Sequence, residues 1–432
     1  MDYGLVLAGF GGLLLLAFIG LPLGFSMMVV GFFGFAFVRG FEPAQEVVGQ
    51  QIIDLAMNQG FSVLPLFLLM GAFVYRAALS NDIYEAAYAW LGHFRGGLSM
   101  TTVTACAGFA AVSGSSVATA ATMAKVSIPP MRRYNYADSF AIGSVAAGGT
   151  IGILIPPSAA MIIYGILTEV DVGKMFIAGI FPGLLTVLVY IGVIVAVTRI
   201  WSNAGPPGTK TAWPDRFRAL TKIWGLLVLF LLVLGGIYFG IFTPTEAGGI
   251  GAVGALLFAL ARRRLNWRSF VASLAEAGRT TAMVFSVAFG AMIFNQFVNI
   301  SGLPGAVVTE VQSLGLSPTE VILVICLVYI ALGCVVEGIG MILLTVPIFF
   351  PMIDALGIDP IWFGIVVIMV TEISLITPPI GLNVFVMKSM LPEVPLGTIY
   401  RGIMPFFGGD LVRLGLVIAF PAIATFLPEV MH

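Results

Sequence analysis

Two short stretches of the sequence combine adjacent prolines with glycine and threonine inside long apolar runs. The first reads GTIGILIPPS over residues 149–158, and the second reads TEISLITPPIGLN over residues 371–383. Proline has no N–H and disfavours the helical conformation of the residue before it. Each stretch therefore predicts a broken helix that leaves bare main-chain carbonyls.

Bare carbonyls are hard oxygen donors, which suit a small cation such as sodium. Two further stretches, SGSS at 113–116 and EGIG at 337–340, offer hydroxyls and flexible turns beside these breaks. We predict two pseudo-symmetric sodium sites at these places. The first consists of Ser113, Ser116, Gly149, Thr150 and Pro156, and the second of Gly338, Gly340, Thr377 and Pro378.

A structural interpretation of the same residues stands beside this one. Glycine and proline are common in membrane helices, and small residues allow such helices to pack closely. Taken singly, each break is better explained in that way. The pattern occurs twice, each time beside a predicted re-entrant tip, and this repetition favours two sites.

Other kinds of chemistry find no support in the sequence. No GxxxxGK[ST] loop occurs, and the GIGAVG match at 249–254 follows no strand, so helix packing explains it better. His93 and His432 are the only histidines, and Cys106, Cys326 and Cys334 lie in apolar runs without metal-binding spacing. We therefore expect neither an enzyme nor a nucleic-acid-binding protein.

Five ionisable positions inside apolar runs need an explanation. Glu337 and Glu372 are candidate functional acids, because charge within a membrane is costly, although Glu337 fits a solvated tip equally well. Asp410 and Arg413 stand one turn apart and predict a neutralising pair. Lys125 is expected to extend to the cytoplasmic surface and not to meet substrate.

The composition identifies the class of protein that holds these residues. Of the 432 residues, 59% are hydrophobic and 9% are charged, and the mean hydropathy is +1.06. Apolar runs of helical spanning length recur along the chain, which predicts an all-α polytopic membrane protein. No basic segment precedes the first run, so we expect a retained helix there.

Similar patterns in the two halves predict an inverted repeat. We place the first repeat at 1–200, a cytoplasmic linker at 201–222 and the second repeat at 223–432. Within them we expect scaffold helices at 4–79 and 223–300, hairpins at about 98–130 and 319–352, broken helices at about 137–166 and 361–390, and C-terminal helices at 397–427. One span is predicted at 282–300, and the stretches 81–95 and 262–279 are candidate interfacial arms, the latter equally well a charged loop.

Basic residues in short loops set the predicted orientation, since such loops stay cytoplasmic. Arg132 and Arg133 place the bases of the first hairpin in the cytoplasm, whereas acidic residues alone flank the second hairpin. The two halves are therefore expected to have opposite orientations, as in secondary transporters. The same count puts both termini outside.

The motifs SGSSVATAATM, GTIGILIPPS, GIFTPTEAGG and EISLITPPIGLNVFVM, in this order, resemble the large membrane (DctM-like) subunit of tripartite ATP-independent periplasmic (TRAP) transporters. The resemblance covers essentially the whole chain. It implies a sodium-driven elevator-type transporter of the bacterial inner membrane that imports organic acids such as C4-dicarboxylates or sialic acid. It also implies two partners on separate chains, a small four-helix membrane subunit and a soluble periplasmic substrate-binding protein.

The resemblance places the substrate, an organic anion, next to the sodium ions in the same region. On that basis the expected substrate-binding residues are Ser115, Pro157, Ser158, Glu337, Pro379 and Asn383. A stand-alone sodium/carboxylate transporter and a channel remain as alternative interpretations. Substrate identity and oligomeric state have no signal in the sequence.

Overall fold

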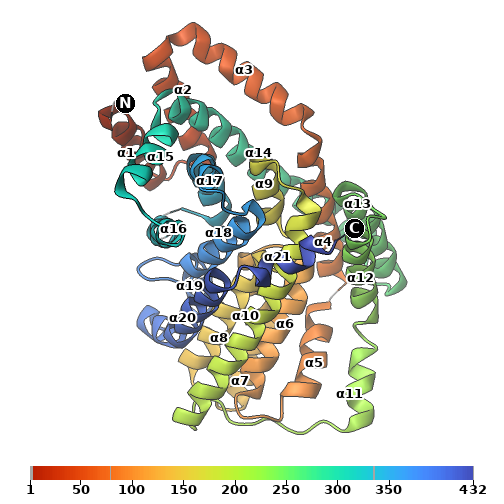
Figure 1. Cartoon of the computed structure of the whole chain (residues 1–432). Helices are drawn as coiled ribbons and strands as arrows, with labels where there is room; N and C mark the ends of the chain where they lie inside the picture. Colours follow the sequence, from red (N-terminus) through yellow and green to blue (C-terminus); the bar gives the residue numbers. More distant parts are fainter. Residues whose placement is uncertain (1–2, 78, 334–335, 432) are drawn as a thin grey trace.

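The computed structural model describes residues 3–77, 79–333 and 336–431, and every regular element in these ranges is a helix (Figure 1). Cys334 lies outside the described residues. Among the described residues, six helices are long and apolar enough to cross a membrane, or seven when the bent pair Trp213–Leu220 and Trp224–Tyr238 is counted as one span. The prediction of an all-α polytopic membrane protein is confirmed.

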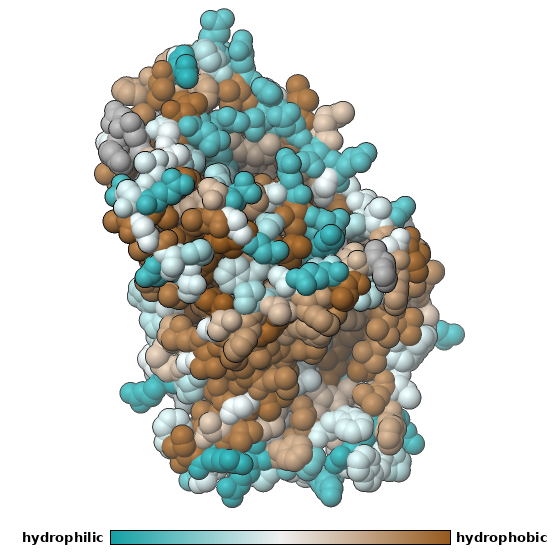
Figure 2. Space-filling model, in the orientation of Figure 1, coloured by the Kyte–Doolittle hydropathy of each residue, from teal (hydrophilic) through white to brown (hydrophobic). Residues whose placement is uncertain are grey.

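The outer surface fits that class. Large apolar side chains are exposed on several helices, including Leu188, Leu231 and Leu327. Figure 2 shows hydrophobic residues gathered in a broad band below the centre of one face, with hydrophilic residues above the band and at its lower end. Such a band is what lipid contact requires.

The first half begins with helices expected for the scaffold. These are α1 (Tyr3–Phe18), α2 (Leu23–Arg39), α3 (Phe41–Met57), η1 (Gln59–Ser62) and α4 (Val63–Arg76). The helix α5 (Leu79–Leu91) follows, in the stretch 81–95 that is the candidate interfacial arm. A hairpin and a broken helix follow, made of α6 (Gly97–Ser113), α7 (Ser116–Arg133), α8 (Asp138–Thr150), η2 (Ile151–Ile153) and α9 (Ala159–Thr168). The long helix α10 (Val172–Ile200) closes this half.

The second half contains elements in the same order after α11 (Trp213–Leu220), α12 (Trp224–Tyr238) and α13 (Pro244–Ala261). They are α14 (Trp267–Ile300), α15 (Leu303–Leu314), the hairpin α16 (Pro318–Leu332) and α17 (Gly338–Ala355), and the broken helix α18 (Pro360–Ser374) and α19 (Leu382–Met390). The chain ends with α20 (Leu396–Ala419) and α21 (Ala422–Glu429). Two hairpins and two discontinuous helices are therefore present, as the sequence predicts.

Glycine allows α2 and α14 to cross at backbone distance. A Cβ placed on Gly290 would lie 1.9 Å from the Gly24 carbonyl oxygen, and one placed on Gly31 would lie 2.6 Å from the Phe294 nitrogen. Close approach of this kind is typical of membrane helices, whose association depends on packing and not on hydrophobic burial.

The prediction for the stretch 262–279 was wrong in part, and the predicted linker at 201–222 contains a short helix. Residues 262–266 form a basic turn, but residues 267–300 form a single 34-residue helix, so a charged loop occupies only the first five residues of 262–279. The predicted span 282–300 is only part of α14. The helix extends because Asn266 and Ser269 form a capping box at its start, and its basic residues remain exposed. In the linker, α11 forms and packs against α5, where Lys222 contacts Glu85 at 2.7 Å.

Candidate cation and substrate site

The first break, residues 151–158 between α8 and α9, is buried. After η2 the chain leaves helical geometry, passes through a cis peptide bond between Pro156 and Pro157, and resumes as α9. All of these residues are buried except the half-buried Ile155. In the part of the chain that the structure describes, no hydrogen bond reaches the carbonyls of residues 154–157. The first break therefore has the bare carbonyls that its prolines predict.

The tip of the first hairpin, residues 113–116, sits directly on this break. A Cβ on Gly152 would lie 2.6 Å from the Ser115 carbonyl oxygen, and one on Gly114, whose φ is +56°, would lie 3.2 Å from the Pro157 carbonyl oxygen. Further down, a Cβ on Gly149 would lie 2.6 Å from the Ala120 side chain. Glycine is needed here because two backbones approach each other without room for a side chain.

Hydroxyl groups complete this junction. The Ser113 hydroxyl bonds the Thr119 hydroxyl at 2.7 Å, and Ser115 caps α7 by accepting from the Ala118 N–H at 3.4 Å. Ser116 is buried at the first position of α7. Of the residues predicted for the first sodium site, Ser113, Ser116 and Gly149 thus gather at the junction, and Pro156 lies within the break.

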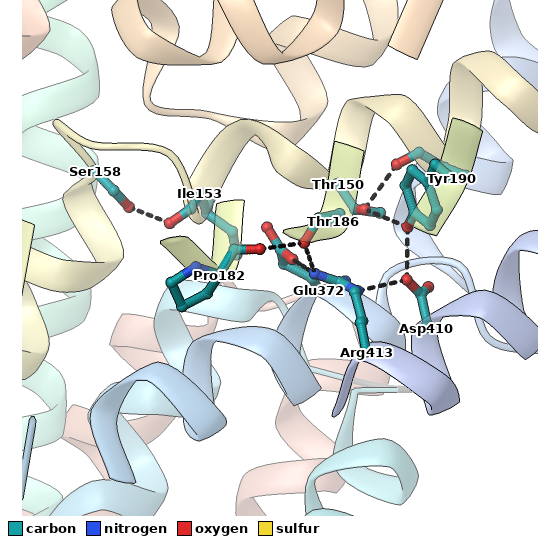
Figure 3. Close-up of polar contacts among 10 residues, drawn as sticks. Thr150, Ile153, Ser158, Pro182, Thr186, Tyr190, Glu372, Asp410 and Arg413 are labelled. Carbon is teal, nitrogen blue, oxygen red and sulfur yellow. Dashed lines mark hydrogen bonds and ion pairs between the residues drawn. The ribbon is translucent and has the colours of Figure 1, made fainter. Parts of the chain in front are cut away.

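The other predicted residues of this region point in different directions: Thr150 toward α10, Ser158 across the break and Pro157 toward the hairpin tip. The Thr150 hydroxyl donates to the Ala147 carbonyl at 2.7 Å and lies 3.3 Å from the Tyr190 hydroxyl of α10, away from the hairpin. The Ser158 hydroxyl donates to the Ile153 carbonyl at 2.6 Å, which spans the break (Figure 3). Pro157 lines a small hollow together with Ser113.

The second break, residues 375–381 between α18 and α19, is more open. Pro378, Pro379 and Ile380 are exposed. The Tyr400 hydroxyl of α20 donates to the Pro379 carbonyl at 2.5 Å and contacts the Ile380 carbonyl at 2.9 Å. The prediction that the Pro379 carbonyl would be bare was wrong, because α20 folds back and supplies a donor.

The second hairpin meets the broken helix at the last turns of α18. A Cβ on Gly338 would lie 2.9 Å from the Thr371 methyl group, and one on Gly340 would lie 2.2 Å from Leu23 of the scaffold helix α2. Thr377 lies in the break and its hydroxyl donates to the Ile373 carbonyl at 2.6 Å. Gly338, at the start of α17, thus packs against the last turns of α18, and Thr377 and Pro378 lie in the break. Gly340 faces the scaffold helix α2 instead.

The remaining predicted substrate residues lie apart. Glu337 is exposed at the N-cap position of α17, as expected for a solvated tip residue. Asn383 is buried in α19, where its side-chain amide donates to the Ala146 carbonyl of α8 at 3.2 Å and its backbone N–H donates to the Leu375 carbonyl at 3.0 Å. Asn383 therefore joins the two broken helices.

A family model described as "Tripartite ATP-independent periplasmic transporter, DctM component" matches residues 10–423. The chain belongs to the DctM family. It is accordingly a multi-pass membrane permease of a transporter and not an enzyme.

Curated relatives and a solved structure agree with this assignment. The chain is 40% identical over 381 residues to the C4-dicarboxylate TRAP transporter large permease protein DctM of Pseudomonas aeruginosa, a match that covers 88% of each protein. It is 31% identical over 419 residues to the sialic acid TRAP transporter large permease protein SiaM of Vibrio cholerae, with 97% of each covered. Its fold is similar to that of the Alcanivorax borkumensis YdaH transporter, with a TM-score of 0.65, 15% identity and coverage of 88% and 89% of the two chains.

Beside the breaks, the DctM permease holds a buried charge cluster, defined here as Glu372, Asp410 and Arg413 (Figure 3). Arg413 donates to Asp410 at 2.7 Å, which confirms the predicted pair, and to Glu372 at 2.9 Å. All three side chains are fully buried. Because Arg413 meets two carboxylates, the cluster has a formal charge of −1 when all three groups are ionised.

Hydroxyls of α10 tie this charge cluster to the first break. Arg413 also donates to the Thr186 hydroxyl at 2.8 Å, and the Tyr190 hydroxyl donates to Asp410 at 2.7 Å while it lies near Thr150. Sequence reasoning missed Thr186 and Tyr190 as partners. Their only signal in the sequence is that they stand four residues apart and hence lie on one face of α10.

Proposed function

We propose that this permease is the translocating subunit of a sodium-coupled importer of an organic acid. The observation that carries the proposal is the first break, where unpaired carbonyls lie buried beneath a serine-rich hairpin tip. Buried backbone carbonyls without donors are costly. A cation that accepts their lone pairs removes this cost.

The donors at the first junction suit sodium better than a transition-metal ion. The junction offers carbonyls and the hydroxyls of Ser113 and Ser116, all neutral hard oxygens. No cluster of three or more histidine, cysteine, aspartate or glutamate side chains occurs among the described residues, so the donor set does not resemble a transition-metal site. The second site, with Gly338, Gly340, Thr377 and Pro378, has the weaker support, because the neighbouring carbonyls of Pro379 and Ile380 already accept from Tyr400.

Transport is proposed to follow an elevator mechanism. The hairpins, the broken helices and α20 pack on one another, as the pairs α7 with α8, α8 with α20 and α9 with α17 illustrate. A second group contains α2 with α14 and α4 with α13. In this proposal the first group carries substrate past the second, which is the scaffold, and the repeats are 1–200 and 223–432.

The family and relatives guide the choice of partners and substrate. The family is described as tripartite, which supports a small membrane subunit and a soluble periplasmic binding protein as partners in a bacterial inner membrane. Relatives are named for C4-dicarboxylates and sialic acid, both organic acids. We propose a substrate of that class, with contacts at Ser115, Pro157, Ser158, Glu337, Pro379 and Asn383.

Reconstitution into proteoliposomes tests the proposal. Succinate and N-acetylneuraminate are offered to the permease alone, with its small subunit, and with the binding protein added, each with and without an inward sodium gradient. Uptake that needs all three proteins and sodium is the expected result. Equal uptake without sodium would overturn the coupling.

The alternative functions give different results in the same assay. Sodium-driven uptake by the lone chain would favour a self-sufficient carboxylate transporter. Flux at channel rates without sodium coupling would favour a channel.

A further inference from the structure

A cavity of about 310 Å³ lies between the first hairpin and the expected scaffold. Helices α6 and α7 supply one wall and α4 and α14 supply the other. The cavity borders on the tip, since Ser113 and Ser115 line it. It therefore begins where the proposed substrate region ends.

One face of α7 points into this cavity. Ser115, Ala118, Thr122 and Lys125 all line it, at successive spacings of three, four and three residues. Side chains with this spacing lie in a row along a helix. The small Ala118 leaves space, while Thr122 and Lys125 offer polar groups deeper along the row.

The spare charge in the cavity is positive. Glu276 of α14 also lines the cavity, but Arg76 of α4 binds its carboxylate at 3.2 Å. Lys125 is exposed, and in the described ranges no carboxylate lies within ion-pair distance of it. An ammonium group with three donors and no counter-ion attracts an anion.

We propose that Lys125 and Thr122 form a carboxylate-binding subsite, through which an organic anion passes between the hairpin tip and the hairpin base. The inference rests on the proposed function, since it supposes that the anion is the transported substrate. It also revises the expectation that Lys125 avoids substrate. Lys125 moves with the hairpin, whereas the Arg76–Glu276 pair stays on the scaffold, so the subsite lies on the boundary where the two parts slide.

A charge-sensitive labelling experiment tests the positive field without knowledge of the substrate. Thr122→Cys is introduced into the full-length permease in complex with its small subunit, with the native cysteines replaced. Its labelling rates with an anionic (sulfonatoethyl) and a cationic (trimethylammonioethyl) methanethiosulfonate are compared. Lys125→Gln should lower the anionic-to-cationic rate ratio by about fivefold, as expected from one unit charge at close range.

Matched controls secure the interpretation. Arg133→Gln removes an exposed charge from the same helix, about 12 Å further along it, and should leave the ratio unchanged. Ala121→Cys, which also lines the cavity, replaces Thr122→Cys if that variant fails to fold. An unchanged ratio in Lys125→Gln would overturn the subsite.

The substrate step is tested separately. Millimolar succinate or N-acetylneuraminate, whichever the assembled transporter takes up, should slow labelling at the cavity several-fold, and Lys125→Gln should abolish this protection. If Lys125→Gln changes the labelling ratio but the transported acid does not slow labelling, the cavity attracts anions without binding substrate. That result would contradict the substrate role. A Lys125-dependent field in a protein that shows no sodium-driven uptake would instead refute the proposed function and leave the anion-attracting cavity.

Discussion

The two helix breaks differ in how their backbone carbonyls are surrounded. The first break is buried beneath the Gly114–Ser115 turn and keeps bare carbonyls. The prolines of the second break are exposed, and two of its carbonyls are within hydrogen-bond distance of the Tyr400 hydroxyl. A repeated motif therefore does not imply equal sites, and we expect the first break to bind its cation more tightly.

Charge differs between the breaks as well. Glu372 stands at the end of α18, at the place in the repeat where α8 has Thr150. Arg413 holds that carboxylate, and Tyr190 connects the other end of the charge cluster to Thr150. The charge cluster thus fixes both breaks to α10 and α20.

Removing Arg413 should have the largest effect. Arg413→Ala leaves two buried carboxylates without a cation, which typically costs about 3–5 kcal/mol. We expect a large fall in thermal stability and in the yield of folded permease, measured by fluorescence-detected size exclusion after heating. Arg401→Ala, an exposed change in the same helix, is the control, and equal stability of the two variants would show that the charge cluster does not hold the breaks together.

A side chain added at the junction between the first hairpin tip and the first break should have the second-largest effect. Gly152→Ala places a methyl group 2.6 Å from a backbone oxygen, whereas Gly338→Ala meets a side-chain methyl group at 2.9 Å. Overpacking against immobile backbone costs about 1–3 kcal/mol, so uptake should fall roughly tenfold in Gly152→Ala and less in Gly338→Ala. Equal losses in initial uptake rate would remove the distinction between the tips.

Removing the proposed hydroxyl ligands should distinguish the two proposed sodium sites in transport assays. Ser116→Ala removes a buried hydroxyl that makes no hydrogen bond to the side chains or backbone of the described residues, and should raise the sodium concentration for half-maximal uptake by roughly tenfold. Thr377→Ala should have a smaller effect, because that hydroxyl already donates to Ile373. Unchanged sodium titrations in both variants would remove the site assignment.

Tyr400→Phe should have the smallest effect. It removes one partly exposed hydroxyl from the second break, which is worth about 1 kcal/mol or less. A melting-temperature shift of a few degrees, with no change in the sodium response of the first site, is expected. A shift as large as that of Arg413→Ala would show that the second break depends on Tyr400 far more than its exposure suggests.

The features of the fold that the sequence could predict are those that depend on local residue types. Prolines 156, 157, 378 and 379 mark the breaks, and the serines and glycines at 113–116 mark a tip, because proline and glycine act on their own backbone. The extension of α14 was also readable, since Asn266 and Ser269 form a capping box.

Partners distant in sequence could not be predicted. Arg413 and Glu372 are 41 positions apart, and Tyr400 reaches Pro379 only because α20 folds back along the second break. No periodicity encodes these meetings. The same holds for Lys125, whose row along α7 is legible but whose facing helices, α4 and α14, are known only from the fold.

Direct binding of radioactive sodium to the purified permease tests the central claim, that the two broken helices hold cations with unequal strength. The account predicts two classes of sites in the wild type, with Ser116→Ala weakening the tighter class and Thr377→Ala the looser one. A single isotherm, identical in the wild type and in both variants, would contradict it.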